Sequence, residues 1–320
     1  MMEISKEKKE KKKRIVSIWV CILIFIGAFF AGMISKVAIK PAWSTKYTAT
    51  WSEELGTKIT DISYGDEEAN KFDLYLPKDS TKDTYGLVIY LHAGGFTSGD
   101  KADDENMLAW LCSKGYVAAG INYTLRTDEI KEAIPIVVEE AKNRGYNIDK
   151  MTVAGGSAGH ALAMIYAYRD AQDAPVPVVF TFGAVGPSCF YVEDWGVYGL
   201  DQNTEESRIA AANLFSVMGG VEITPEEIQN GSYTEKMKPI SAAEWVSENP
   251  IPTVVAYGTC DKVQPFLASL RLKEALEDNG LDYKYYELPH SGHGLQNDDR
   301  ISEQWMESID EYLNKYMPVN

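Results

Sequence analysis

The sequence predicts an α/β fold in which a mostly parallel sheet is covered by helices. From about residue 56 onward, short apolar runs of strand length alternate with longer stretches of helical periodicity, which is typical of repeated strand and helix units. In addition, residues 151–160 read MTVAGGSAGH, so that an apolar strand runs directly into a glycine-flanked serine, Ser157. Such a turn from strand to helix belongs at the carboxyl edge of a parallel sheet.

The expected strands are short, apolar and rich in β-branched or aromatic residues, and turn-forming residues bound them. The first two, Lys58–Tyr64 and Phe72–Leu76, are expected to pair antiparallel. Those that follow are expected to be buried in the parallel part of the sheet. They are Gly86–Leu91, Tyr116–Tyr123, Met151–Ala154, Pro177–Phe182, Thr253–Tyr257 and Tyr283–Leu288.

The expected helices lie between these strands and carry apolar residues at helical spacing on one face, with charged residues elsewhere. The third of them begins directly after Ser157, and the last closes the chain. They are Asp103–Lys114, Asp128–Arg144, Ala158–Tyr168, Pro265–Asn279 and Ser302–Tyr316.

The first residues of the chain predict a membrane anchor. Residues 1–14 form a basic tail with an excess of four positive charges, and Ile15–Ser35 are twenty-one residues without a charge. As a helix this run would span about 30 Å, the thickness of a hydrocarbon core. The basic side is expected in the cytoplasm, and therefore residues 36–320 outside the membrane. A cleaved signal peptide is the alternative, although the run is longer than a usual h-region.

We therefore expect a cytoplasmic tail over 1–14, a single transmembrane helix over 15–35, a linker over 36–55 and one folded domain over 56–320. The chain carries a net charge of −16, and removing the basic tail leaves −20 for the rest. Such an acidic body repels nucleic acid, so a neutral or weakly charged small molecule is the expected partner. Cysteines and histidines are few and show no metal-like spacing, so no metal, cofactor or disulfide framework is expected. The oligomeric state is not encoded in a readable pattern.

Three further loops at the ends of expected strands carry polar or glycine-rich sequence. His92-Ala-Gly-Gly-Phe96 follows one strand, and its paired glycines can turn backbone N–H groups inward or simply form a tight turn. Asp261 follows a later strand, where a helix cap is the alternative role. His290 and His293 lie in the loop after the last strand, and each alone could be an ordinary polar loop residue.

In chain order, the glycine-rich loop, the serine turn, the aspartate and the histidine loop resemble the motifs of the α/β-hydrolases. Residues 57–316 are most similar to the hormone-sensitive-lipase-like and the acetyl-xylan and feruloyl esterase-like branches. The matching segments are His92-Ala-Gly-Gly95, Gly155-Gly-Ser-Ala-Gly159, Asp261-Lys-Val-Gln-Pro265 and Gly292-His-Gly294. The chain departs from the family pattern at Ala93, where the family has glycine, and at Gln264, an added residue before the proline.

The resemblance implies an α/β-hydrolase fold and a serine esterase with the catalytic residues Ser157, Asp261 and His293. It also implies an oxyanion hole formed by the backbone N–H groups of Gly94, Gly95 and Ala158. His293 is favoured over His290 because glycines flank it as in the family. The expected substrates are short-chain or acetyl esters, glycan esters among them. A peptidase, a lipase or a non-catalytic binding module of the same fold are the alternatives.

Residues 185–250 interrupt the expected order of strands and helices, and the resemblance implies that they form a cap over the site. The segment is rich in aromatic residues, which can bind an acyl chain, a phenolic ester or a sugar face, or can form the cap's own core. These residues are Phe190, Tyr191, Trp195, Tyr198, Phe215, Tyr233 and Trp245.

Overall fold

The computed structural model describes residues 42–124 and 127–319. The chain divides into two units, Met1–Lys46 and Tyr47–Asn320. The described part of the first unit contains a short 3₁₀ helix, Ala42–Lys46. The predicted transmembrane helix over 15–35 and the basic tail lie outside the described residues. Within the described ranges, no helix combines the length and the apolar character needed to cross a membrane.

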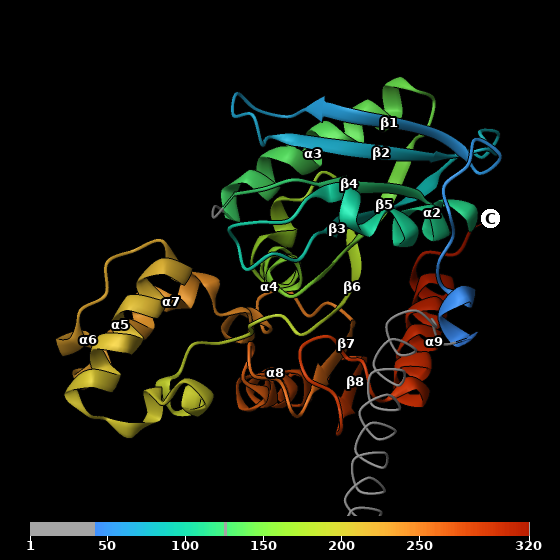
Figure 1. The fold of residues 1–320 in the computed structure, drawn as a ribbon. Helices are drawn as coiled ribbons and strands as arrows, with labels where there is room; N and C mark the ends of the chain where they lie inside the picture. Colours follow the sequence, from blue (N-terminus) through green and yellow to red (C-terminus); the bar gives the residue numbers. More distant parts are fainter. Residues whose placement is uncertain (1–41, 125–126, 320) are drawn as a thin grey trace, which may run out of the picture. The chain divides into compact units, whose positions relative to one another are not determined.

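The described part of the second unit is built on an eight-stranded sheet with the order β1-β2-β4-β3-β5-β6-β7-β8 (Figure 1). The strand β1 (Gly56–Ser63) pairs antiparallel with β2 (Lys71–Pro77), and β2 pairs antiparallel with β4 (Val117–Ile121). From β4 onward all neighbouring strands are parallel. The remaining strands are β3 (Tyr85–Leu91), β5 (Ile148–Gly156), β6 (Val178–Ala184), β7 (Thr253–Gly258) and β8 (Tyr283–Leu288). The predicted α/β class with a mostly parallel sheet is therefore confirmed.

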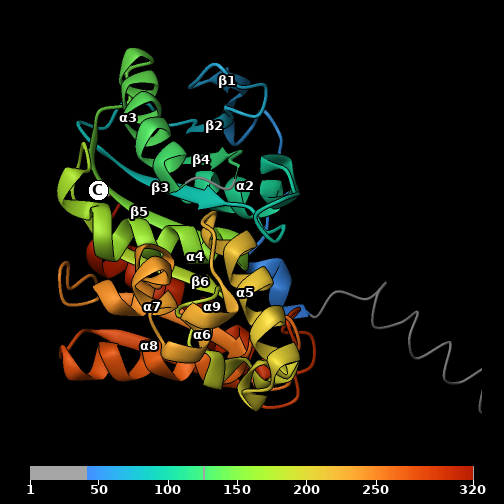
Figure 2. The same cartoon turned by 90° about the vertical axis from the view of Figure 1, so that its left-hand side faces the viewer.

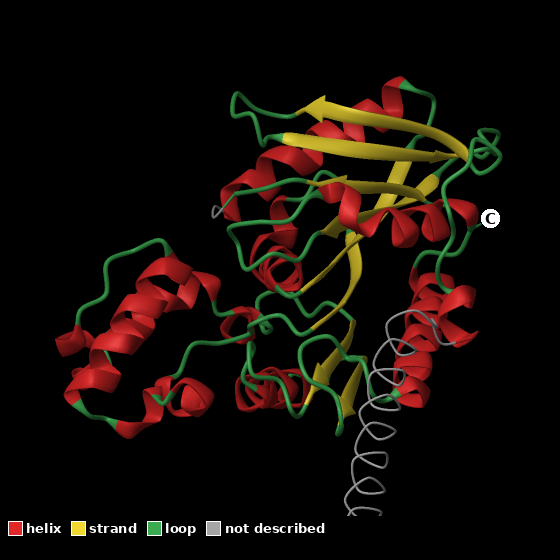
Figure 3. Cartoon of the chain, in the orientation of Figure 1, coloured by secondary structure: helices red, strands yellow, loops and turns green. Residues whose placement is uncertain are grey.

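Helices cover both faces of this sheet. Figures 1 and 2 show α3 (Thr127–Asn143), α4 (Ala158–Ile165) and α8 (Phe266–Asp278) on one side, with α2 (Glu105–Ser113) and α9 (Asp299–Tyr316) on the other. Figure 3 shows the same layers by type of structure. Because the central strands are covered on both faces, all five residues of β4 are buried. The loops that carry the predicted site residues therefore extend from the ends of strands that are covered by helices.

Most expected elements differ from the observed ones by one to three residues at each end. The helix after Ser157 differs in type as well: the α-helix ends at Ile165, three residues before the expected end, and Tyr166–Asp170 continues as a π-helical turn. The expected helix at Asp103 begins as a 3₁₀ turn, Lys101–Asp104. Asp100 is the N-cap of this turn and forms a capping box. Both differences lie at the end of a helix, where hydrophobic periodicity does not distinguish an α-helical turn from a 3₁₀ or a π-helical turn.

The segment 185–250 forms a lobe made of α5 (Glu205–Gly219), α6 (Pro225–Asn230) and α7 (Tyr233–Met237) with short 3₁₀ turns between them (Figure 1). Four of its aromatic side chains pack on one another in a core of the lobe's own: Phe190, Trp195, Phe215 and Tyr233. The ring centroids of Trp195 and Phe215 lie 5.4 Å apart in an edge-to-face arrangement. This part of the aromatic set therefore stabilises the lobe itself.

Candidate active site

Ser157 occupies the turn between β5 and α4, with φ of 52° and ψ of −118°. Positive φ is unfavourable for a residue with a side chain, so the surrounding packing must hold this turn. A Cβ atom on Gly155 would lie 2.5 Å from the carbonyl carbon of Gly159, and one on Gly159 would lie 2.0 Å from the carbonyl oxygen of Leu91. The two glycines thus let α4 approach β3 and β5 closely at the turn that carries Ser157.

Ser157, His293 and Asp261 form one hydrogen-bonded chain. The Nε2 atom of His293 lies 2.9 Å from Ser157 Oγ, and its Nδ1 atom lies 2.7 Å from Asp261 Oδ2. The Asp261 side chain is 1% exposed and the His293 side chain 27% exposed. A carboxylate that accepts from Nδ1–H leaves Nε2 free to accept the serine proton, so the arrangement can activate a hydroxyl nucleophile.

The second oxygen of Asp261 is held by the backbone of its own turn. Its Oδ1 atom accepts hydrogen bonds from the N–H groups of Val263, at 2.7 Å, and Gln264, at 3.0 Å. These bonds supply the partners that a buried carboxylate needs, and they direct Oδ2 toward His293. Gln264, the added residue in the motif, contributes one of them.

The loops that carry Asp261 and His293 are attached to each other. The N–H group of Cys260 donates to the carbonyl of Ser291 at 3.0 Å, and that of Thr259 donates to the carbonyl of Leu288 at 3.0 Å. A Cβ atom on Gly258 would lie 2.4 Å from the carbonyl oxygen of Gly292. The close approach at this glycine brings the carboxyl ends of β7 and β8 into one compact region.

The glycine-rich loop after β3 lies beside the turn at Ser157. Gly94 and Gly95 have φ of 143° and 61°, and the carbonyl of Gly94 accepts from the N–H groups of Thr97 and Ser98. A Cβ atom on Gly156 would lie 4.0 Å from the Cβ atom of Ala93, so the two loops face each other. Ala158 is the first residue of α4, where an N–H group has no acceptor within the helix. The use of these N–H groups as an oxyanion hole stays a prediction.

The other histidines have different surroundings. His92 stacks on Tyr123 with ring centroids 4.4 Å apart, and its carbonyl accepts from the Tyr123 hydroxyl, which shapes the glycine-rich loop. Burial lowers the pKa of His160 to about 3, and the N–H group of Gly186 donates to its Nδ1 atom. His290 has a 78% exposed side chain and pairs with Asp298. No motif in the sequence indicated Tyr123 or Asp298.

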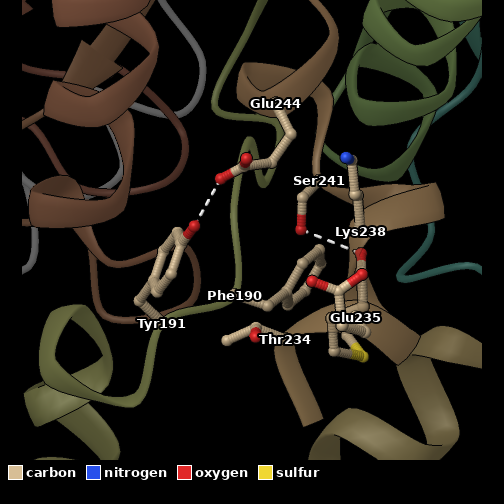
Figure 4. Close-up of a pocket in the computed structure, with 8 residues that line it drawn as sticks. Phe190, Tyr191, Thr234, Glu235, Lys238, Ser241 and Glu244 are labelled. Atoms are coloured by element: carbon tan, nitrogen blue, oxygen red, sulfur yellow. Dashed lines mark hydrogen bonds between the residues drawn. The ribbon is translucent and has the colours of Figure 1, made fainter. Parts of the chain in front are cut away.

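A hollow of about 90 Å³ lies in the lobe and does not include Ser157, Asp261 or His293 among its lining residues. Figure 4 shows that Tyr191 donates a hydrogen bond to Glu244 across this hollow. The lining is mostly polar and consists of Phe190, Tyr191, Thr234, Glu235, Met237, Lys238, Ser241 and Glu244. Tyr198, in contrast, is exposed and donates to the carbonyl of Val263, next to the Asp261 turn, at 2.8 Å.

In the residues that the structure describes, no group of three or more His, Cys, Asp or Glu side chains is placed to hold a metal ion.

Comparison with known proteins places the chain among α/β-hydrolases. It is 31% identical over 117 residues to a kynurenine formamidase of Danio rerio, covering 33% of this chain and 38% of the relative. It is 23% identical over 247 residues to the esterase LipC of Mycobacterium tuberculosis, covering 73% of this chain and 59% of the relative. The chain thus spans between about two fifths and three fifths of the length of these curated relatives.

A solved structure shares the fold. The truncated form of a carbohydrate esterase from gut microbiota superposes with a TM-score of 0.62 at 17% identity, covering 83% of this chain and 98% of that chain. The family model described as BD-FAE matches residues 72–276, which include the glycine-rich loop, Ser157 and Asp261. The resemblance to α/β-hydrolases of the esterase branches is therefore confirmed, and the chain belongs to the BD-FAE family.

Proposed function

We propose that the chain is a serine carboxylic ester hydrolase that acts through an acyl-enzyme on Ser157. The observation that carries this proposal is the hydrogen-bonded chain from Ser157 Oγ through His293 to the buried Asp261. It combines a hydroxyl held on a constrained turn, a base within reach and a carboxylate that orients the base. A binding module would have no need of this arrangement.

In the first half of the proposed reaction, Ser157 Oγ attacks the ester carbonyl carbon while His293 Nε2 takes the hydroxyl proton. The negative charge that develops on the carbonyl oxygen is stabilised by the N–H groups of Gly94, Gly95 and Ala158. His293 then gives its proton to the alcohol oxygen as the carbon–oxygen bond breaks. In the second half, water attacks the acyl-serine, with His293 again accepting a proton and returning it to Ser157.

Asp261 does not exchange protons in this scheme. Its carboxylate fixes the histidine tautomer and stabilises the imidazolium that forms in each half-reaction. The two backbone hydrogen bonds on its Oδ1 atom keep it oriented through the cycle.

We propose short-chain or acetyl esters, glycan esters among them, as the substrates. The net charge of −16 supports a neutral substrate over a polyanionic one. A second candidate is hydrolysis of an N-formyl amide at the same site, which the 31% identity to a kynurenine formamidase favours. The two candidates share the nucleophile and differ in the leaving group.

We also propose that Ile15–Ser35 anchors the protein in a membrane with the hydrolase domain on the extracytoplasmic side. The charge-free run and the basic residues before it support this orientation. Protease added to intact cells should degrade the domain over 56–320 while the amino-terminal tail stays protected. A domain that is degraded only after cell lysis contradicts the orientation.

The function is tested by assaying the full chain in mild detergent with p-nitrophenyl acetate, butyrate and octanoate and with an N-formyl arylamine, next to the Ser157→Ala variant. Ester hydrolysis that depends on Ser157 and is fastest with acetate supports a short-chain esterase. Preference for the formamide supports the second candidate. Equal, background rates in both proteins contradict both.

A further inference from the structure

A second carboxylate, Asp298, lies at the base of the loop that carries His293. Its side chain is 6% exposed and accepts three hydrogen bonds. Its Oδ2 atom accepts from the backbone N–H of His290 at 3.0 Å and from the hydroxyl of Ser291 at 2.6 Å. Its Oδ1 atom lies 2.8 Å from Nδ1 of His290. All three partners belong to His290 and Ser291, which follow Pro289 at the start of the loop after β8.

Further bonds close the loop on itself. The N–H group of Asn297, directly before Asp298, donates to Ser291 Oγ at 3.0 Å. The side-chain amide of Asn297 donates to the carbonyl of His290 at 2.7 Å. The two ends of the loop are thus joined through Ser291, Asn297 and Asp298, and His293 lies in the part between them.

The hydrogen bonds to Asp298 favour its charged form. Burial favours its neutral form, but the hydrogen bonds from Ser291 and His290 outweigh burial and hold the pKa of Asp298 below its ordinary value. An ionised carboxylate accepts all three bonds at once, and charge-assisted bonds are stronger than neutral ones. Among the described residues, no hydrogen bond or ion pair joins Asp298 to Ser157 or to the His293 ring, so an effect on the reaction would pass through the loop.

We propose that Asp298 is a positioning residue for the reaction. Its carboxylate joins the two ends of the loop by hydrogen bonds and thereby keeps His293 within hydrogen-bonding distance of Ser157 and Asp261. This inference rests on the proposed function. Catalytic groups tolerate little displacement, and a shift of about 1 Å can cost about 100-fold in rate. The loop contains Gly292 and Gly294 on either side of His293. Without the hydrogen bonds of Asp298, the backbone there has much freedom to move.

The test compares Asp298→Ala, Asp298→Asn and Glu307→Ala in the full chain. Glu307 is an exposed acid on α9, the helix that begins next to Asp298, and serves as the matched control. We expect Asp298→Ala to lower kcat by about 10- to 100-fold with little change in KM, because the base is displaced while substrate contacts stay. Asp298→Asn, whose amide keeps one accepting oxygen, should lose less, and Glu307→Ala should match the wild type.

A second measurement does not depend on turnover. A proton shared between His293 Nδ1 and Asp261 gives a resonance at unusually low field in the proton NMR spectrum. It should broaden or vanish in Asp298→Ala and persist in Glu307→Ala. Circular dichroism and thermal unfolding establish that the variants are folded. If Asp298→Ala does not fold, Asp298→Asn decides: a lower kcat at unchanged KM supports the proposal.

Wild-type kcat and an unchanged low-field resonance in a folded Asp298→Ala variant overturn the inference, and so does a rise in KM at unchanged kcat. Failure of the proposed function looks different, because the wild type would then hydrolyse no ester faster than Ser157→Ala does. The resonance can still be read in that case, so the positioning of His293 by Asp298 is tested independently of activity.

Discussion

Ser157 Oγ lies 2.9 Å from His293 Nε2 although 136 residues separate them in the chain. Ser157 follows β5 and His293 follows β8, with β6 and β7 between these two strands in the sheet. The parallel order brings the carboxyl ends of all four strands to one edge, and the loops from β7 and β8 then extend back toward β5. The contact therefore depends on the sheet as a whole.

Replacing Asp261 by asparagine should lower kcat by about 10⁴-fold, the loss seen when a triad carboxylate of this kind is neutralised in a serine protease. The amide keeps the shape but can donate to Nδ1, which favours the tautomer whose Nε2 cannot take a proton. Steady-state kinetics on a p-nitrophenyl ester measure the effect. Asp278→Asn, an exposed position on α8, is the control and should retain full activity. A loss below about 10-fold would contradict the assigned role.

Replacing Gly159 by alanine should destabilise the fold far more than replacing Gly280. A Cβ atom at Gly159 would lie 2.0 Å from the Leu91 carbonyl oxygen, whereas at Gly280, with φ of 61°, it would meet nothing within 4 Å. We expect Gly280→Ala to cost about 1 kcal/mol through its backbone conformation, and Gly159→Ala to cost several times as much or to prevent folding. Urea unfolding gives both values. Equal costs would show that α4 can move away from β3.

Truncating Phe215 to alanine should lower the free energy of unfolding by about 3 to 5 kcal/mol, because the side chain is fully buried among the aromatic rings of the lobe. Val217→Ala, two residues along α5 and 60% exposed, should change it by less than about 0.5 kcal/mol. Denaturant unfolding followed by tryptophan fluorescence provides the measurement. A small effect of Phe215→Ala would mean that the lobe packs more loosely than the ring contacts indicate.

Stability should fall as the pH is lowered through the range from about 6.5 to 3. The pKa of His160 is about 3 in the folded chain and about 6.5 in an unfolded one. Between these values the unfolded chain binds a proton that the folded chain does not, so the contribution is complete above pH 6.5 and is lost toward pH 3. The slope from this group is up to about 1.4 kcal/mol per pH unit.

The His160→Asn variant isolates this contribution, since an amide oxygen can accept from Gly186 N–H but does not titrate. Its free energy of unfolding, measured in urea at several pH values between 4 and 7, should depend less steeply on pH than that of the wild type. Parallel curves for the two proteins would assign the acid sensitivity to other groups.

The sequence predicted well those features that depend on local pattern. The apolar run at Gly86–Leu91 corresponds to β3 within one residue, and the segment around Ser157 to the turn between β5 and α4. Parallel strands are buried on both faces and leave a continuous apolar signal, which explains this agreement. His293 and Asp261 could be proposed because each has a short motif.

Features that depend on contacts between distant or irregular segments were not predictable in this way. Asp298 carries no motif, and its three hydrogen bonds exist only because the loop after β8 folds back on itself. The Tyr123 hydroxyl donates a hydrogen bond to the backbone carbonyl of His92, 31 residues away in the chain. Because the acceptor is a backbone group, no pattern of side chains predicts this bond. In the lobe, only the aromatic composition was readable from the sequence. The structure shows which of these residues form the core, where Trp195 packs on Phe215, and which are exposed, such as Tyr198.

The most direct test of the central claim, that Ser157 is a nucleophile activated by His293, is covalent labelling by a fluorophosphonate followed by peptide mass spectrometry. We predict a single label on the peptide that contains Ser157, formed at a rate that His293→Ala lowers by orders of magnitude. Ester hydrolysis by a protein that is never labelled on Ser157, or labelling that is unaffected by His293→Ala, would contradict the account.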